Sequence, residues 1–124
     1  MSAAKRTILA IDDSLTIREL VNFVLSNAGF NVVLAEDGLE GLSALGHCSP
    51  DVIITDVNMP RLDGLSFIER ARAETSAKST PILVLTTESG AEQKARAKAA
   101  GATGWIVKPF NPAQLVEAVR RVAP

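Results

Sequence analysis

The stretch DVIITDVNMPRLDG, residues 51–64, joins an apolar run to a polar loop that is rich in turn-forming residues. The β-branched residues Val52, Ile53 and Ile54 are typical of a strand covered on both faces, and such strands occur mainly in parallel sheets flanked by helices. Asp56 ends this run. Open α/β sheets place their ligand sites at the carboxyl ends of strands, which makes Asp56 a candidate functional residue. The alternative is that its carboxylate only hydrogen-bonds the following turn.

Apolar runs of strand length alternate with helical patterns along the rest of the chain. The expected strands cover residues 7–11, 31–35, 51–56, 81–85 and 103–107, with residues 32–35 as the buried part of the second. The expected helices begin at Ser14 or Thr16, Asp37, Asp63, Gly90 and Asn111, with Pro112 in the first turn of the last one. This alternation predicts an α/β fold, a doubly wound (βα)5 parallel sheet with helices on both faces.

The expected helices differ in how firmly they are anchored. The first, third and last helices each carry a stripe of apolar residues that is expected to face inward. The stripe of the first helix is Ile17, Leu20, Val21, Val24, Leu25 and Ala28, that of the third is Leu65, Ile68 and Ala71, and that of the last is Leu115, Val119 and Val122. The helix over residues 90–100 is rich in alanine and has no large apolar residue. It is therefore expected to have high helix propensity but weak packing.

Length and composition limit the class of protein. A chain of 124 residues fits one domain, so we expect residues 1–124 to form a single domain with no output domain. The net charge of −1 gives no reason to expect binding to nucleic acid or membranes. Cys48 is the only cysteine and is expected to be a packed small hydrophobe, and the early apolar run, residues 8–11, is too short for a signal peptide or a membrane span. A cytoplasmic location is therefore expected.

Polar residues follow four of the five expected strands. Asp12 and Asp13 follow the first strand, Asp56 the third, Thr86 the fourth and Lys108 the fifth. Each has a simpler explanation when taken alone, as a helix cap, a strand-end hydroxyl or a solvated charge. Parallel strands bring their carboxyl ends to one edge, so these explanations would all have to hold at the same place. The pattern therefore favours a functional site there.

The chemistry of this set indicates a phosphoryl-accepting site. Three neighbouring carboxylates repel one another and raise the pKa of at least one of them, unless a cation shares the site. Oxygen ligands without nearby histidine or cysteine favour Mg²⁺. An aspartate beside Mg²⁺, a lysine and a hydroxyl is suited to receive a phosphoryl group, with Asp56 as the nucleophile, Lys108 balancing the remaining charge and Thr86 offering a hydroxyl donor.

The whole chain resembles a bacterial response-regulator receiver domain of the stand-alone chemotaxis type. The matching residues are Asp12, Asp13, Asp56, Met59, Pro60, Gly64, Thr86, Lys108, Pro109 and Phe110. The resemblance implies a flavodoxin-like sheet in the strand order 2-1-3-4-5. It also implies that the peptide bond between Lys108 and Pro109 is cis.

The resemblance assigns a role to each residue at the sheet edge. Asp12, Asp13 and Asp56 would bind Mg²⁺ together with the backbone carbonyl of Asn58. Asp56 would take a phosphoryl group from the phosphohistidine of a partner histidine kinase, and Thr86 and Lys108 would contact the phosphoryl oxygens. The protein would then be a regulatory phosphoacceptor, with no enzymatic activity beyond its own phosphorylation and autodephosphorylation. Asn58 and Glu88 lie two residues beyond site residues and are expected to tune the lifetime of the acyl phosphate.

Switching in such receivers implies a coupled movement of Thr86 and an aromatic residue on the fifth strand, here Trp105. The family more often has Tyr or Phe at that position, and Thr87 is bulkier than the Ala often found beside the hydroxyl residue. An inward swing of the indole is therefore expected to be hindered. The expected partner surface is the weakly anchored helix with the last strand and the last helix, and its candidate contacts are Lys94, Lys98, Trp105 and Val116.

The sequence leaves several functions open. The favoured one is a monomeric chemotaxis switch that binds a flagellar-motor switch protein when phosphorylated, but an adaptor or a phosphate sink for a shared kinase would carry the same site. A small aspartyl-phosphate hydrolase uses similar chemistry, although Asp56-Val57-Asn58 lacks the second acid that protonates a leaving group. A flavin binder is disfavoured by the acidic edge and by the absence of a phosphate-cradling loop. His47, the only histidine, is expected to be a surface residue.

Overall fold

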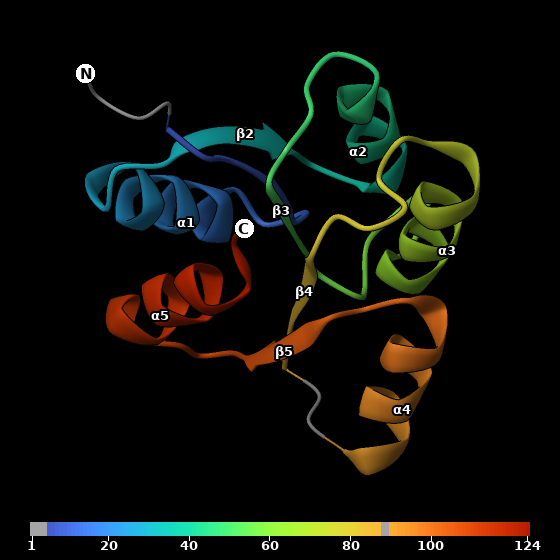
Figure 1. Cartoon of the computed structure of the whole chain (residues 1–124). Coiled ribbons are helices and arrows are strands. Elements are labelled where there is room, and N and C mark those ends of the chain that lie inside the picture. The colour runs from blue at the N-terminus through green and yellow to red at the C-terminus, as the bar shows by residue number, and fades with distance from the viewer. Residues whose placement is uncertain (1–4, 88–89) are drawn as a thin grey trace.

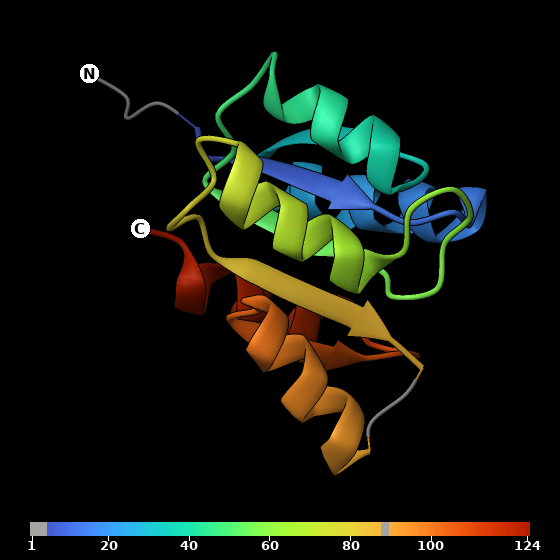
Figure 2. The same cartoon turned by 90° about the vertical axis from the view of Figure 1, so that its right-hand side faces the viewer.

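The sheet of this protein has five parallel strands in the order β2-β1-β3-β4-β5. A computed structural model describes residues 5–87 and 90–124. The strands are β1 (Thr7–Ile11), β2 (Asn31–Ala35), β3 (Val52–Thr55), β4 (Ile82–Thr86) and β5 (Gly104–Val107). The arrowheads of β1 and β4 point the same way in Figure 2, so the carboxyl ends of the strands share one edge. The strand order implied by the family resemblance is confirmed.

Five helices cover the two faces of the sheet. They are α1 (Leu15–Asn27), α2 (Gly38–Leu45), α3 (Gly64–Glu74), α4 (Ala91–Ala100) and α5 (Pro112–Val122). Figure 1 shows α1 and α5 on one face and α2, α3 and α4 on the other. Alternate residues of β3 enter separate cores, Val52 and Ile54 on the α1 and α5 face and Ile53 on the opposite face. The prediction that this strand is covered on both faces is confirmed.

Side-chain caps fix where four of the helices begin, as the sequence predicts. Ser14, Asp37, Asp63 and Asn111 each accept a hydrogen bond from the backbone N–H three residues later. Ser14 is therefore the first cap, and not Thr16. A polar side chain at the end of a strand thus also orients the helix that follows it.

Several sequence expectations need correction. Leu20 was expected to point inward, but it is 37% exposed, because it lines an open groove between α1 and α5. Three residues of β2, residues 32–34, are only partly buried, because β2 is an edge strand. Phe67 on α3 was not predicted as a core residue, yet it is fully buried. The third, fourth and fifth strands each begin one residue later than expected, at Val52, Ile82 and Gly104. The third also ends one residue earlier, at Thr55, and the fourth one residue later, at Thr86.

Helix α4 is the least firmly packed helix of the fold. Ala97 is its only buried residue, and its first residue is preceded by Gly90, which provides no side-chain cap. Burial of one methyl group contributes little to stability compared with the large apolar side chains of α1 and α3. The weak anchoring that the sequence predicts for this helix is confirmed.

The described part of the chain contains no helix with the length and apolar character needed to cross a bilayer.

His47 is exposed, as expected. Cys48 is partly buried, and burial raises the pKa of its thiol, which keeps the thiol protonated at neutral pH.

Candidate functional site

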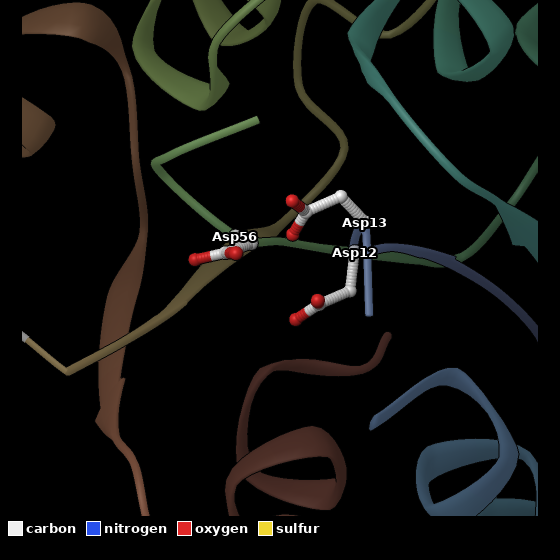
Figure 3. A group of neighbouring side chains, drawn as sticks. All are labelled: Asp12, Asp13 and Asp56. Atoms are coloured by element: carbon white, nitrogen blue, oxygen red, sulfur yellow. The ribbon is translucent and has the colours of Figure 1, made fainter. Parts of the chain in front are cut away.

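Three aspartates from neighbouring strands meet at the carboxyl edge of the sheet. Asp12 and Asp13 follow β1 and Asp56 follows β3, and the backbone N–H of Asp56 donates to the carbonyl of Ile11 at 2.9 Å. One carboxylate oxygen from each aspartate lies within 4.8 Å of the other two. Figure 3 shows the side chains of Asp12 and Asp13 leaving the chain on the side where Asp56 lies. The juxtaposition expected from the sequence is therefore present.

Asp12 is buried and held on both of its carboxylate oxygens. The backbone N–H of Ser14 donates to Oδ1 at 2.9 Å, and Nζ of Lys108 donates to Oδ2 at 2.8 Å. A second basic residue, Arg18, donates from Nη1 to the backbone carbonyl of Asp12 at 2.7 Å. These contacts fix Asp12 firmly, whereas Asp13 is exposed to solvent.

Asp56 is 8% exposed, and its surroundings disfavour the charged form. Burial raises the pKa of the Asp56 carboxyl, and the negative charges of Asp12 and Asp13 raise it further. Lys108, whose Nζ lies 3.5 Å from Oδ2, and the N–H of Val57, which donates to Oδ1 at 2.8 Å, offset only part of this effect. The cluster therefore carries electrostatic repulsion that an added cation would relieve.

This repulsion predicts an effect of Asp56→Asn on stability. A carboxyl whose pKa is higher in the folded than in the unfolded chain opposes folding once it ionises, so the penalty is full above the folded pKa and absent below the unfolded one. Without Mg²⁺, we expect Asp56→Asn to raise the free energy of unfolding at neutral pH by on the order of 1 kcal/mol. The gain should shrink as the pH falls through the pKa of Asp56. Urea unfolding of both proteins in EDTA at several pH values measures this gain in stability. Equal stability of Asp56→Asn and the wild type at neutral pH would contradict the prediction.

The other predicted residues lie around this cluster at different depths. Thr86 ends β4, is buried, and accepts from the backbone N–H of Lys108 at 2.8 Å through its own carbonyl. The peptide bond between Lys108 and Pro109 is cis, as predicted. Thr87 and Asn58 are exposed. Glu88 lies outside the described residues.

Trp105 is partly buried on β5 and packs against the core beneath α2, α3 and α4. Its indole Nε1 is buried and has no hydrogen-bond partner within residues 5–87 and 90–124. The ring lines a groove of about 500 Å³ between α3 and α4 and a smaller one of about 210 Å³ on the other side of α4. The indole thus lies directly beneath the least firmly packed helix.

The four residues predicted for the partner surface fall into two places. Lys94 and Lys98 are exposed on α4 and share the smaller groove with Trp105. Val116 on α5 lines a separate groove, the one between α1 and α5. The structure therefore brings three of these residues together but not the fourth.

Sequence reasoning missed a contact at the end of β2, the one strand end to which it assigned no site residue. Asp37, predicted only as a helix cap, also accepts from Nε of Arg61 at 2.7 Å. Arg61 belongs to the loop that follows Asp56. No local signal could reveal this pair, because the two residues are 24 positions apart and meet only through the order of the strands.

The donor set fits a hard divalent cation. Three carboxylates converge within 4.8 Å, one of them exposed to solvent. Mg²⁺ prefers such oxygen ligands and retains water ligands, which an open edge accommodates. Lys108 already balances part of the negative charge through Asp12. The residues present are therefore compatible with a bound Mg²⁺.

Comparison with known proteins gives a consistent result. A family model described as the response regulator receiver domain matches residues 8–120. The chain is 40% identical over 112 residues to the chemotaxis protein CheY1 of Helicobacter pylori, covering 89% of this chain and 90% of that protein.

Two solved structures extend the comparison. The chemotaxis protein CheY4 of Vibrio cholerae superposes with a TM-score of 0.93 at 48% identity, covering 96% of this chain and 99% of that one. The receiver domain of a sensor histidine kinase from Pseudomonas aeruginosa, solved with a magnesium ion coordinated in its active-site cleft, has a TM-score of 0.88 at 27% identity and covers 96% and 98%. The chain belongs to the response-regulator receiver domain family and is similar to its stand-alone CheY proteins.

Proposed function

We propose that this protein is a cytoplasmic phosphoacceptor switch, in which Asp56 takes a phosphoryl group from the phosphohistidine of a histidine kinase in a Mg²⁺-dependent reaction. The observation that carries the proposal is the convergence of Asp12, Asp13 and Asp56 with Lys108 at one sheet edge. Receiver-family membership supports it, and so does the magnesium ion in the cleft of the related kinase receiver.

In the proposed reaction an oxygen of Asp56 forms a bond to phosphorus while the N–P bond of the phosphohistidine breaks. The leaving imidazole keeps the electron pair of that bond and is protonated. Bound Mg²⁺ would neutralise negative charge on the phosphoryl oxygens, with Asp13, Asp12, Asp56 and the carbonyl of Asn58 as its candidate ligands. Lys108, already 3.5 Å from Oδ2 of Asp56, would pair with a second phosphoryl oxygen. The Thr86 hydroxyl would donate to a third.

Phosphotransfer from a kinase tests this directly. A histidine kinase domain carrying a radiolabelled phosphohistidine should pass its label to this chain in Mg²⁺, and hydroxylamine should release the label, because hydroxylamine cleaves acyl phosphates. Label that resists hydroxylamine would contradict an aspartyl phosphate. Repeated turnover of a generic phosphate ester would support the hydrolase alternative instead.

The output we propose is phosphorylation-dependent binding to another protein, with a flagellar-motor switch protein as the first candidate. The chemotaxis names of the related proteins CheY1 and CheY4 support this pathway. An adaptor or a phosphate sink is the alternative. The test is binding of a motor-switch peptide with and without beryllofluoride, which mimics the phosphoryl group. Equal affinity in both conditions would favour the phosphate sink.

The proposed switch couples Asp56 to Trp105 and α4 through Thr86. With Mg²⁺ and beryllofluoride, we expect the fluorescence of Trp105, the only tryptophan, to change and amide exchange in α4 to change with it. Weak anchoring makes α4 the element that moves at the lowest cost. Thr87→Ala should enlarge the fluorescence change if the threonine hinders the indole.

Asp56→Asn serves as the control and should show neither response. If α4 exchanges at the same rate with and without beryllofluoride in the wild type, the proposed coupling is wrong.

A further inference from the structure

The loop from Asp56 to Asp63, here called the acceptor loop, is held by backbone hydrogen bonds at its base and at its tip. At its base the backbone N–H of Gly64 donates to the carbonyl of Val57 at 2.8 Å. A side chain at Gly64 would collide with the backbone carbonyl of Asp56, so the loop closes more tightly than another residue would allow. At its tip the N–H of Leu62 donates to the carbonyl of Pro60 at 2.8 Å, forming a tight turn.

A second element holds this tip from the side. The backbone N–H of Gly38, the first residue of α2, donates to the carbonyl of Leu62 at 3.3 Å. Beside it, Nε and Nη2 of Arg61 approach Oδ2 of Asp37 at 2.7 and 2.5 Å. The tip of the acceptor loop is therefore fastened to the junction between β2 and α2.

Asp37 is well placed to act as a rigid anchor. It is 3% exposed, and its other oxygen, Oδ1, accepts from the N–H of Glu40 at 2.8 Å. Burial raises the pKa of Asp37, but the Glu40 N–H and the guanidinium of Arg61 outweigh it and hold the pKa below its usual value. Both oxygens are thus engaged, and the carboxylate stays charged at neutral pH.

The backbone of Arg61 explains why an anchor is needed. Its φ is +68°, and within the described residues it is the only non-glycine residue with positive φ. Residues other than glycine rarely adopt a positive φ, and they keep it only where surrounding contacts hold them there. The contact with Asp37 provides such a hold, and it acts three residues from Asn58.

We propose that Asp37 and Arg61 are positioning residues for phosphoryl acceptance: their ion pair fixes residues 58–60 of the acceptor loop and so sets the affinity of the site for Mg²⁺. The inference rests on the function proposed above, in which the carbonyl of Asn58 is a metal ligand. It adds to that site two residues that touch neither metal nor phosphoryl group. Outer contacts of this kind commonly change metal affinity by about 10- to 100-fold when they are removed.

Three variants separate the side chain of Arg61 from its backbone. Arg61→Gly removes the guanidinium and relieves the strained φ, Asp37→Asn removes the charge and keeps an oxygen for the Glu40 N–H, and Arg61→Lys keeps a positive charge. Arg70→Gln is the matched control, because Arg70 pairs with Glu74 on the exposed surface of α3, away from the loop.

Calorimetric titration with Mg²⁺ and urea unfolding in EDTA are measured for each variant. We expect Arg61→Gly and Asp37→Asn each to weaken Mg²⁺ binding about tenfold, the double variant to be no weaker than either, and Arg61→Lys to recover part of the loss. Arg61→Gly should unfold at the wild-type urea concentration or above, because glycine adopts positive φ freely. A merely structural contact would lower stability and leave the Mg²⁺ affinity unchanged.

The outcomes distinguish the two proposals. If the wild type binds Mg²⁺ and both single variants bind it equally well, the positioning role is wrong and the proposed function stands. If the wild type binds no Mg²⁺, the proposed function fails and this inference fails with it. Removing a positive charge would by itself strengthen cation binding, so weaker binding in Arg70→Gln as well would show a nonspecific effect of breaking an arginine ion pair and would also overturn the positioning role.

Discussion

Asp56→Asn is expected to abolish phosphorylation of this protein. An amide oxygen is a far weaker nucleophile than a carboxylate, and Asp56 is the proposed acceptor, at the end of β3 with Nζ of Lys108 3.5 Å from its Oδ2. The loss of rate should exceed about a thousandfold, as is usual when a covalent nucleophile is removed. Intact-mass spectrometry after incubation with acetyl phosphate and Mg²⁺ measures the phosphorylated fraction directly.

Asp51→Asn is the matched control, because Asp51 lies before the same strand at the opposite edge and accepts from the N–H of Thr7 at 2.8 Å. It should accept phosphate at the wild-type rate. Wild-type phosphorylation of Asp56→Asn would remove Asp56 as the acceptor. Since that variant is also expected to be more stable, misfolding cannot account for its loss of phosphorylation.

Asp13→Asn is expected to weaken Mg²⁺ binding by about 10- to 100-fold, which corresponds to about 1.4–2.8 kcal/mol. Both oxygens of Asp12 are engaged, by the Ser14 N–H and by Lys108, whereas Asp13 is exposed and lies within 4.8 Å of the other two carboxylates. Asp13 is therefore the carboxylate most available to a cation. The charge of Asp13 also contributes to the repulsion, so Asp13→Asn should be more stable than the wild type in EDTA. In excess Mg²⁺ it should be less stable than the wild type, because it binds the stabilising cation more weakly.

Glu19→Gln is the control for Asp13→Asn, since it removes one negative charge from the exposed surface of α1, outside the cluster. Calorimetry should give it the wild-type Mg²⁺ affinity. Equal affinities for Asp13→Asn and the wild type would show that the cation, if it binds, uses other ligands.

Much of the fold follows from local patterns in the sequence. The run of β-branched residues in β3 predicts a strand buried on both faces, and the caps at Ser14, Asp37, Asp63 and Asn111 predict where helices begin. The gathering of Asp12, Asp13 and Asp56 also follows, because parallel strands deliver the residues after them to one edge. The strand order came from the family resemblance and not from these patterns.

What could not be predicted depends on tertiary contacts. The pair between Asp37 and Arg61 joins two loops that only the folded sheet brings together, and the positive φ of Arg61 has no signature in its residue type. Leu20 has the spacing of a core residue but lies at the edge of the buried stripe of α1. Among the described residues the indole N–H of Trp105 has no hydrogen-bond partner; this depends on how α4 packs, and an alanine-rich helix gives no register for that packing.

In the proposed function, three clustered carboxylates share one divalent cation, which prepares Asp56 for phosphorylation. The most direct test is the rate of Asp56 phosphorylation by acetyl phosphate, measured across a range of Mg²⁺ concentrations and compared with the calorimetric Mg²⁺ affinity. We expect the rate to saturate with Mg²⁺, with a half-saturating concentration equal to the dissociation constant, and we expect both values to shift together in Asp13→Asn. Phosphorylation at the full rate in EDTA would contradict it.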